Sequence, residues 1–190
     1  MLQFLSDKLS AGALIVSQLL LTAIASTDPY FQDVKLEVKG DRLFCSAALM
    51  ESFTPDLDVL LQSGDAVVIH FELDLVKASN DSIVAMANWE HHFRYSLLED
   101  DYSIYTSEND RTQHHYSLED AKQAWVEIEN ALFCRMRVME NDQLYYLRIT
   151  AFLDEMEMPG ITDRMNLMSF WNRIRPVYKS DLFEKRQLVL

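Results

Sequence analysis

Glycine and proline are scarce in this sequence, and acidic residues outnumber basic ones. The 190 residues include four glycines and four prolines, which leaves little room for long flexible linkers. The glycines are scattered singly, so the chain has no glycine-rich loop that would cradle a phosphate. Lysine and arginine total 17 against 30 acidic residues, and the net charge is −13. Because nucleic acid is a polyanion whose binders concentrate basic residues, this charge argues against a nucleic-acid-binding protein.

Cysteine is almost absent, with only Cys45 and Cys134 in the chain. Both lie in stretches that alternate like strands, and Cys134 shares its predicted face with Met136 and Val138. An oxidising compartment would allow a disulfide between Cys45 and Cys134. The inward position of Cys134 instead favours two small buried side chains, and it gives no reason to expect a reactive thiol.

One long uncharged run, Leu9–Thr27, lies near the N-terminus. As a helix, its roughly 19 residues would measure about 28 Å, close to the hydrocarbon thickness of a bilayer. Ala23 and Ala25 are the small residues that a signal peptidase requires at positions −3 and −1, and Pro29 ends any helix. We therefore expect residues 1–25 to be a cleaved signal peptide or an uncleaved membrane anchor. A soluble helix that packs in the domain's own core is the third alternative.

Alternation of apolar and polar residues predicts strands over most of the remaining chain. The clearest strand is residues 67–75, where five apolar side chains point one way and His70, Glu72 and Asp74 point the other way. Predicted hairpins turn at Gly40–Asp41, at 99–101 and at Asn141–Asp142.

Two short helices interrupt these strands. Thr54 suits the N-cap of the first helix, Pro55 its first position and Gly64 its end. Ser117 opens the second helix, whose apolar stripe continues to Leu132. Short connections between strands favour antiparallel pairing, so the sequence predicts an α+β fold, a mainly antiparallel β-sheet or sandwich with two short packing helices.

The last part of the chain shows helical spacing, which predicts a C-terminal helical tail. Its apolar residues at that spacing are Leu167, Phe170, Trp171 and Ile174. We divide the chain into a signal peptide or anchor at 1–25, an antiparallel β-rich domain at 30–158 and a C-terminal tail at 159–190.

Four of the five histidines come in adjacent pairs, His91–His92 and His114–His115. Adjacent residues of a strand point to opposite faces, whereas a metal site needs three or four converging ligands. The sequence therefore predicts solvent-exposed histidines, and neither a metal nor another cofactor is expected.

Aromatic and basic residues near one predicted turn are the candidate binding residues, because tyrosine and arginine are favoured at interfaces. Ordinary packing between neighbouring strands is the alternative explanation. The candidates are Arg94, Tyr95, Tyr102 and Tyr105, together with the tail aromatics Phe170, Trp171 and Tyr178.

Acidic residues offer a different chemistry. Glu72 and Asp74 share a strand face, and such carboxylates with His91 or His92 would suit an exported metal- or carboxylate-dependent hydrolase. No serine or cysteine nucleophile motif accompanies them. The lack of a complete catalytic set favours a binding protein over an enzyme.

Three stretches resemble a bacterial family known as domain of unknown function 4390. They are LDVLLQSGDAVVIHFELDLVK, FRYSLLEDDYSIYT and QLYYLRITAFLDEM. The resemblance runs from about Val34 to Met158, and the tail after Pro159 departs from it. It implies an exported or membrane-tethered envelope protein, and it transfers no catalytic residue.

These observations lead to one expected function and two alternatives. We expect a periplasmic or otherwise extracytoplasmic domain of the cell envelope that binds an envelope protein or a small ligand without transforming it. The alternatives are the exported hydrolase and a soluble cytosolic interaction domain.

A reporter enzyme fused after Asp28 tests the expected compartment. The uncharged run should carry the reporter across the membrane, so activity is expected only outside the cytoplasm. Mass spectrometry of the native N-terminus then separates a cleaved chain, which begins near Ser26, from an anchored one. A reporter that is active only inside the cell would contradict export.

Overall fold

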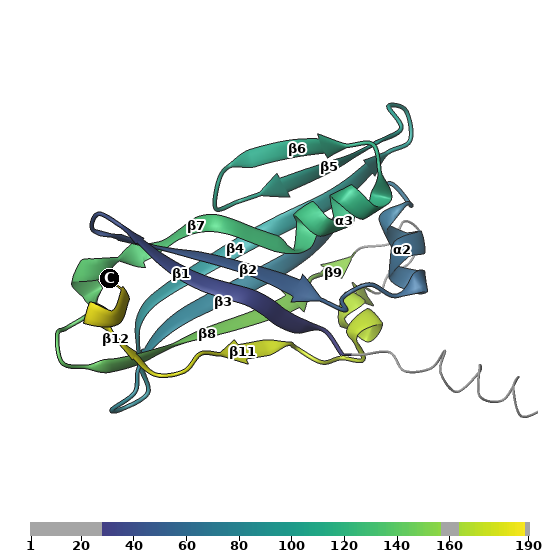
Figure 1. Ribbon diagram of the computed structural model, residues 1–190. Coiled ribbons are helices and arrows are strands. Elements are labelled where there is room, and N and C mark those ends of the chain that lie inside the picture. Colours follow the sequence, from purple (N-terminus) through teal and green to yellow (C-terminus); the bar gives the residue numbers. More distant parts are fainter. Residues whose placement is uncertain (1–27, 157–163, 189–190) are drawn as a thin grey trace, which may run out of the picture.

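The structure is a computed structural model that describes residues 28–156 and 164–188. Most of its strands form two antiparallel sheets packed face to face, with helices α2 (Pro55–Leu61) and α3 (Leu118–Val126) at one end (Figure 1). The predicted fold class, a mainly antiparallel α+β sandwich with two short helices, is confirmed. The predicted leader at 1–25 and the boundary at 158–159 lie outside the described residues.

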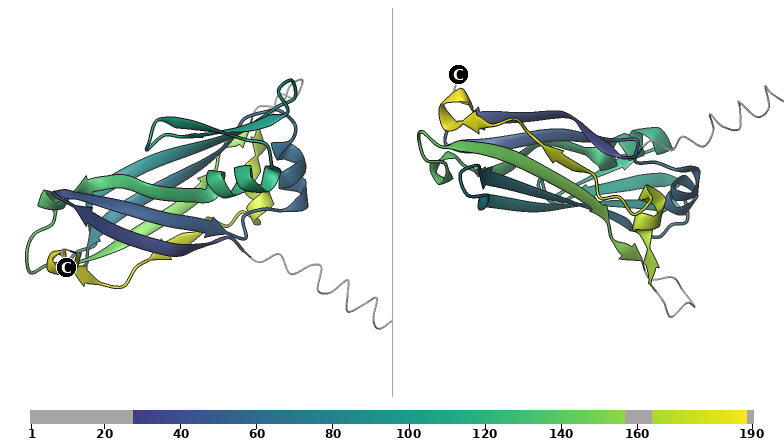
Figure 2. Two further views of the ribbon diagram at one scale, coloured as in Figure 1. Left: turned by 45° about the horizontal axis from the view of Figure 1, so that its top comes forward. Right: turned by 90° about the horizontal axis from the view of Figure 1, so that it is seen from below.

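The two sheets differ in width, with three strands in one and seven in the other. The smaller sheet has the order β1 (Tyr30–Lys39), β2 (Arg42–Met50), β7 (Glu127–Arg135). The larger sheet has the order β11 (Val177–Lys179), β8 (Leu144–Leu153), β3 (Val67–Lys77), β4 (Ser82–Ser96), β5 (Asp101–Thr106), β6 (Arg111–His115), and β12 (Phe183–Glu184) also pairs with β8. A small separate pair joins β9 (Glu155–Met156) to β10 (Met165–Asn166). The long strands of both sheets extend along the length of the molecule, and those of one sheet cross those of the other at an angle (Figure 2).

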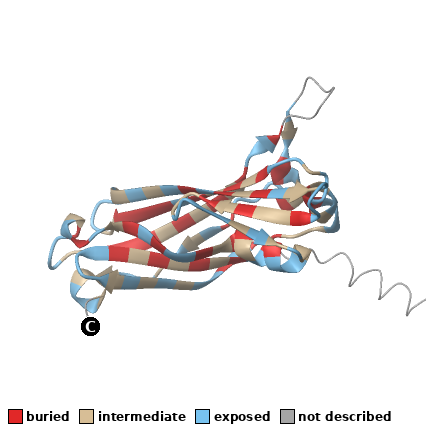
Figure 3. Cartoon of the chain, turned by 90° about the horizontal axis from the view of Figure 1, so that it is seen from above, coloured by how far each residue is buried: buried red, intermediate tan, exposed pale blue. Residues whose placement is uncertain are grey.

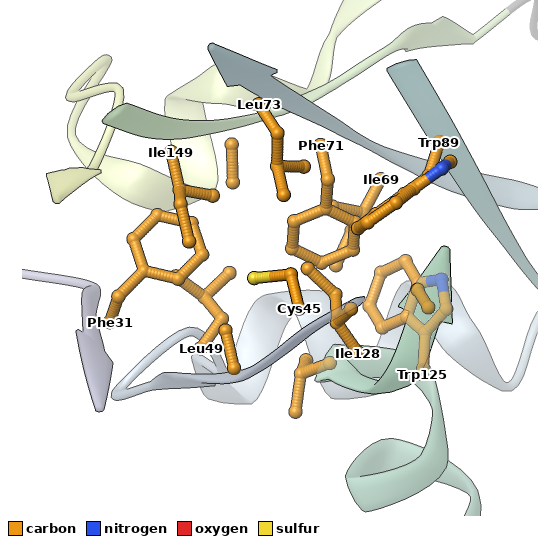
Figure 4. Close-up of a cluster of buried hydrophobic side chains, with 14 of the residues drawn as sticks. Phe31, Cys45, Leu49, Ile69, Phe71, Leu73, Trp89, Trp125, Ile128 and Ile149 are labelled. Carbon is orange, nitrogen blue, oxygen red and sulfur yellow. The ribbon is translucent and has the colours of Figure 1, made fainter. Parts of the chain in front are cut away.

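Strand β3 is central because both of its edges are paired, to β4 on one side and to β8 on the other. Its predicted inward residues are all fully buried, namely Val67, Ile69, Phe71, Leu73 and Leu75. Cys45 and Leu49 from β2 and Trp125 from α3 meet this face in the core between the sheets (Figure 4). Buried residues recur along the strands at the spacing that a two-residue period produces (Figure 3).

Tight turns in this glycine-poor chain are made largely by aspartate. Asp81, Asp100, Asp110 and Asp142 all have positive φ, between 47° and 59°. Asparagine and aspartate tolerate this left-handed conformation better than other residues with a side chain. Gly40, with φ of +65°, makes the predicted turn between β1 and β2.

Both predicted helix caps are present. The Thr54 hydroxyl accepts from the Leu57 amide at 3.2 Å in α2, and the Ser117 hydroxyl accepts from the Asp120 amide at 3.5 Å in α3. The prediction that the second helix continues to Leu132 is wrong, because α3 ends at Val126 and β7 begins at once. Pairing of β7 with β2 supplies the backbone hydrogen bonds that a longer helix would have made.

The predicted hairpin around Asn141–Asp142 is also wrong. The chain turns there, but β7 belongs to the smaller sheet and β8 to the larger one. The 3₁₀ turn η1 (Met136–Val138) begins the crossing from one sheet to the other. Apolar and polar residues alternate in both segments, which correctly predicts two strands. This pattern does not show which strand each of them pairs with.

The C-terminal helical tail is not formed. The tail contains the 3₁₀ turns η2 (Leu167–Trp171) and η3 (Lys185–Leu188), and its strands β11 and β12 pair with the edge of β8. Asn172 and Arg173 have φ of +51° and +61°, which ends the helical turn after Trp171. Helical spacing was therefore a poor guide here, because an unpaired strand edge was available to the tail.

Truncation of Leu73 tests the central role of β3. Leu73→Ala should lower the free energy of unfolding by about 2–5 kcal/mol, because it leaves a cavity between the sheets. Urea denaturation measures the change. Met86→Ala, on the exposed face of β4, is the control and should change stability by less than about 0.5 kcal/mol. Equal losses in the two variants would contradict this assignment of the core.

Candidate functional site

The predicted aromatic and basic patch is divided between the two faces of the larger sheet. Tyr95 pairs with Tyr102, and their ring centroids are 4.8 Å apart on the face that is turned toward the core. Arg94 pairs with Ser103 on the opposite face, where Tyr105 packs against His92. The structure thus brings the two tyrosines together but separates them from Tyr105, because adjacent strand residues alternate.

The predicted tail aromatics lie elsewhere. Trp171 is 2% exposed and donates from Nε1 to the Ser52 carbonyl at 2.8 Å, so it is a core residue and presents no contact surface. Phe170 and Tyr178 are half-buried against the core. Tyr178 pairs with β8, which β3 separates from β4. The seven candidates do not form one site.

The turn between β4 and β5, which we call the β4–β5 tip (residues 96–101), presents Leu97 and Leu98 to solvent. Their exposures are 71% and 99%. The tip is held by hydrogen bonds, since the Glu99 amide donates to the Ser96 hydroxyl at 3.2 Å and the Tyr95 hydroxyl donates to Asp100 at 2.6 Å. A cleft of about 360 Å³ beside the tip is lined by Arg94 and Tyr95 as well as by both leucines.

The neighbouring Asp100 makes the Tyr95 hydroxyl a weaker acid. The hydrogen bond that it donates to Asp100 raises the pKa of Tyr95. This hydrogen bond links the last residue but one of β4 to the turn and helps to fix the geometry of the tip.

His91 is buried, contrary to the prediction of solvent-exposed histidines. Its Nδ1 lies 2.8 Å from the Trp125 carbonyl, and Trp125 Nε1 donates to the His91 carbonyl at 2.8 Å. The apolar neighbours Trp89 and Phe93 share its face of β4. That alternation was visible in the sequence and would have placed His91 in the core.

Glu108 meets the other nitrogen of this histidine. His91 Nε2 lies 3.0 Å from Glu108 Oε1, and the Glu108 side chain is only 1% exposed. A carbonyl oxygen only accepts, so His91 Nδ1 donates to Trp125, and Nε2 is left to form the hydrogen bond with Glu108. Glu108 Oε2 is buried without a hydrogen-bond partner among the described residues. Leaving such an acceptor unpaired costs about 1–3 kcal/mol.

Glu108 lines a second depression, which we call the acidic cleft. It has a volume of about 340 Å³ and lies between the β5–β6 hairpin, α3 and the start of β7. Its carboxylates come from Glu108, Asp120, Glu127 and Glu129, and no lysine or arginine lines it. His115 also lines it, and its Nε2 is buried without a partner within the described chain.

The sequence analysis missed the acidic cleft. Positions 120, 123 and 127 follow helical spacing on the polar side of the stripe that predicted the second helix. That spacing predicts two acids and a glutamine on one surface. Glu108 carries no such signal, because it lies in a turn and reaches His91 across the hairpin.

The combination required for a hydrolase is not assembled. Glu72 and Asp74 lie on the outer face of β3, whereas His91 points inward from β4. Asp74 accepts two hydrogen bonds from Arg148, at 2.6 and 3.1 Å. His92 pairs with Val68, four residues along β3 from Glu72, and contacts Glu90. In residues 28–156 and 164–188, no group of three or more His, Cys, Asp or Glu side chains is arranged to hold a metal ion.

A family described only as a domain of unknown function, DUF4390, matches residues 28–180 of the chain. The chain belongs to the DUF4390 family. The match covers the smaller sheet and all strands of the larger sheet except β12, and it confirms the resemblance carried by the three stretches. It also includes β11, so the first part of the tail, which was expected to depart from the family, lies within the match. Neither the curated proteins nor the solved structures give a match to this chain.

The helices of this DUF4390 domain are short. Within the part of the chain that the structure describes, no helix has both the length and the apolar character needed to cross a membrane. The leader predicted from Leu9–Thr27 lies outside the described residues.

The two cysteines of the DUF4390 domain are free thiols, so the disulfide considered from the sequence is not formed. They lie on paired strands, but Cys45 is opposite Ala131 and Cys134 is opposite Leu43. Cys134 is half-buried, and Met136 lies beyond the end of β7, so the predicted shared strand face is interrupted. Burial raises the pKa of Cys45 to about 12 and that of Cys134 to about 11.

Alkylation kinetics test this state of the thiols. At pH 8 we expect iodoacetamide to modify both native cysteines roughly ten-fold or more slowly than in the unfolded chain, because the folded thiols stay protonated. Peptide mass spectrometry gives each rate, and Cys134 should react faster than Cys45. The raised pKa also stabilises the fold below about pH 9, and this contribution is lost as the pH rises toward 12. Thiols that become reactive only after reduction would indicate a disulfide instead.

Proposed function

We propose that this DUF4390 protein is an exported, non-enzymatic binding module of the bacterial cell envelope that holds a protein partner on the extracytoplasmic side. The expected compartment is supported by the uncharged run Leu9–Thr27 with small residues at Ala23 and Ala25. The family match starts at residue 28 and β1 starts at Tyr30, directly after this run. This order supports a leader that delivers the domain.

The observation that carries the binding role is the exposure of Leu97 and Leu98 on the β4–β5 tip. Isolated exposed leucines are common, but these two are adjacent and lie on a turn fixed by the Tyr95–Asp100 hydrogen bond. A fixed apolar projection loses little conformational freedom when a partner covers it. Covering a leucine side chain contributes roughly 1.5–3 kcal/mol.

Two other strongly exposed hydrophobic residues belong to elements at the same end of the molecule. The four large hydrophobic side chains with the highest exposure in the described chain are Leu98, Tyr116, Val59 and Leu97. Tyr116 follows the end of β6, which pairs with the start of β5, and Val59 belongs to α2 at the same end of the molecule (Figure 1). Exposed apolar residues that gather at one end favour a protein contact.

The charges near the tip favour a protein partner over a lipid surface. Glu99 and Asp100 are exposed beside the two leucines. Anionic lipid headgroups would be repelled by these acids. A partner with an apolar centre and a basic rim would instead satisfy both the leucines and the acids.

The hydrolase alternative has less support than binding. His91 lies on the opposite face of the larger sheet from Glu72 and Asp74, and His92 pairs with Val68, four residues along β3 from Glu72. Asp74 is already engaged by Arg148. General acid–base catalysis requires such groups to converge on one substrate.

Photo-cross-linking in intact cells tests the proposed contact. A photoreactive amino acid in place of Leu98 should give a discrete adduct with an envelope protein. One in place of Met86, which is 63% exposed on the outer face of β4, should not. With the photoreactive group moved to Tyr116, Leu97→Ser with Leu98→Ser should lower the adduct yield about ten-fold, because both anchors are lost.

Met86→Ser is the matched control for the tip variant and should leave the yield unchanged. Thermal unfolding of each variant verifies that the fold is kept. The proposal fails if positions 98 and 86 give the same adducts, or if the tip variant keeps the full yield.

A further inference from the structure

The acidic cleft lies beside the outermost strands β6 and β7, which contribute Gln113, His115, Glu127 and Glu129 to its lining. β6 is the last strand of the larger sheet and β7 the last strand of the smaller one, so each has a single strand partner within residues 28–156 and 164–188. The β5–β6 hairpin and β7 flank this side of the sandwich, and α3 lies across one end of it (Figure 2). Each outermost strand leaves one backbone edge without a pairing strand.

The charge of the cleft has one sign. Glu108, Asp120, Glu127 and Glu129 line it without a neighbouring lysine or arginine in the lining. Lys122, on the same helix as Asp120, is instead engaged by Asp58 and Glu119 at 3.0 and 3.1 Å. Like charges held together raise the electrostatic free energy of the unliganded protein, so a cation is attracted here.

Glu108 provides an independent indication of a ligand. Its side chain is 1% exposed, its Oε1 is taken by His91, and its Oε2 has no hydrogen-bond partner in the described part of the chain. A guanidinium or ammonium group would donate to Oε2 through a charge-assisted hydrogen bond. His115 Nε2, also buried and unpartnered in the described residues, lines the same cleft and adds a second polar group for a ligand.

We infer that the acidic cleft binds an extended, basic segment of a protein, with an arginine or lysine side chain of that segment donating to Glu108. The free edges of β6 and β7 offer backbone hydrogen bonds to such a segment, and the four carboxylates select its charge. A metal ion is not the inferred ligand, because the described residues contain no group arranged to hold one. The inference goes beyond the proposed function, since it depends neither on the β4–β5 tip nor on the compartment.

Binding of a defined peptide to the purified full chain tests this inference. Fluorescence anisotropy compares a labelled peptide of alternating arginine and valine, Arg-Val-Arg-Val-Arg-Val, with Glu-Val-Glu-Val-Glu-Val. The basic peptide should bind at least ten-fold more tightly, and its affinity should fall as salt is added. Equal affinity for the two peptides would overturn the inference.

Substitutions in the cleft identify the residue responsible. Glu108→Gln keeps the size of the side chain and a hydrogen-bonding group for His91 but removes the charge, so it should weaken binding of the basic peptide about ten-fold or more. Glu72→Gln makes the same charge change on the outer face of β3 and should leave the affinity within about two-fold. Unchanged affinity in Glu108→Gln would overturn the inference.

A second variant guards against a folding defect in Glu108→Gln. Gln123 lines the cleft and is exposed on α3, so Gln123→Lys should place a cation in the cleft and abolish peptide binding while thermal unfolding stays unchanged. Spermine and calcium chloride are tested as competitors. If spermine or calcium displaces the peptide at a concentration similar to that at which the peptide itself binds, the cleft is a site for small cations and the inference is wrong.

The contact proposed for the β4–β5 tip and the peptide binding inferred for the acidic cleft can be tested independently of each other. Leu97→Ser with Leu98→Ser should leave binding of the basic peptide unchanged, because the tip is outside the acidic cleft. Loss of peptide binding in that variant would show that the peptide does not occupy the cleft.

Discussion

The burial of one face of β3 determines the arrangement of the rest of the domain. Its inner residues are covered by the smaller sheet and by α3, while both of its edges are paired, so its register is fixed on every side. A shift by one residue would expose the whole apolar set. The same register places His91 opposite Ile69 on the inner face and Arg148 opposite Asp74 on the outer face.

Local features of the sequence were sufficient for the elements that depend on local contacts. The Thr54 and Ser117 caps, the Gly40 turn and the inward set of β3 were predictable because each involves neighbours in the chain. The end of α3, the sheet of β8 and the strands of the tail were not predictable in this way. Each of these was decided by an edge of β2, β3 or β8 that the chain meets far away in sequence.

The candidate surfaces were predicted less well than the fold. Tyr95 and Tyr102 do meet, but Trp171 was assigned to a surface and is buried, since composition does not distinguish an interface aromatic from a core one. The acidic cleft depends on Glu108, which reaches His91 from a turn 17 residues further along the chain. Such a contact becomes visible only when the strands are paired.

Both proposed surfaces lie where the two sheets differ in width. The larger sheet continues through β5 and β6, whereas the smaller sheet stops at β7, and α3 packs on these outer strands. The tip and the acidic cleft are therefore supported by a rigid sheet but are not enclosed by its partner. Rigid strands that carry exposed turns position contact residues while leaving them accessible.

The use of aspartate in the tight turns has a consequence for how copies of this protein meet. Every hairpin that turns on Asp81, Asp100 or Asp110 ends in a negative charge. Two molecules whose hairpin ends or unpaired strand edges meet would bring these negative charges close together, and the charges would repel. Aspartate, which takes the left-handed conformation in place of glycine, thus also discourages association between copies of the protein. This suits a domain in which, among the described residues, β6 and β7 each keep one backbone edge free for another chain.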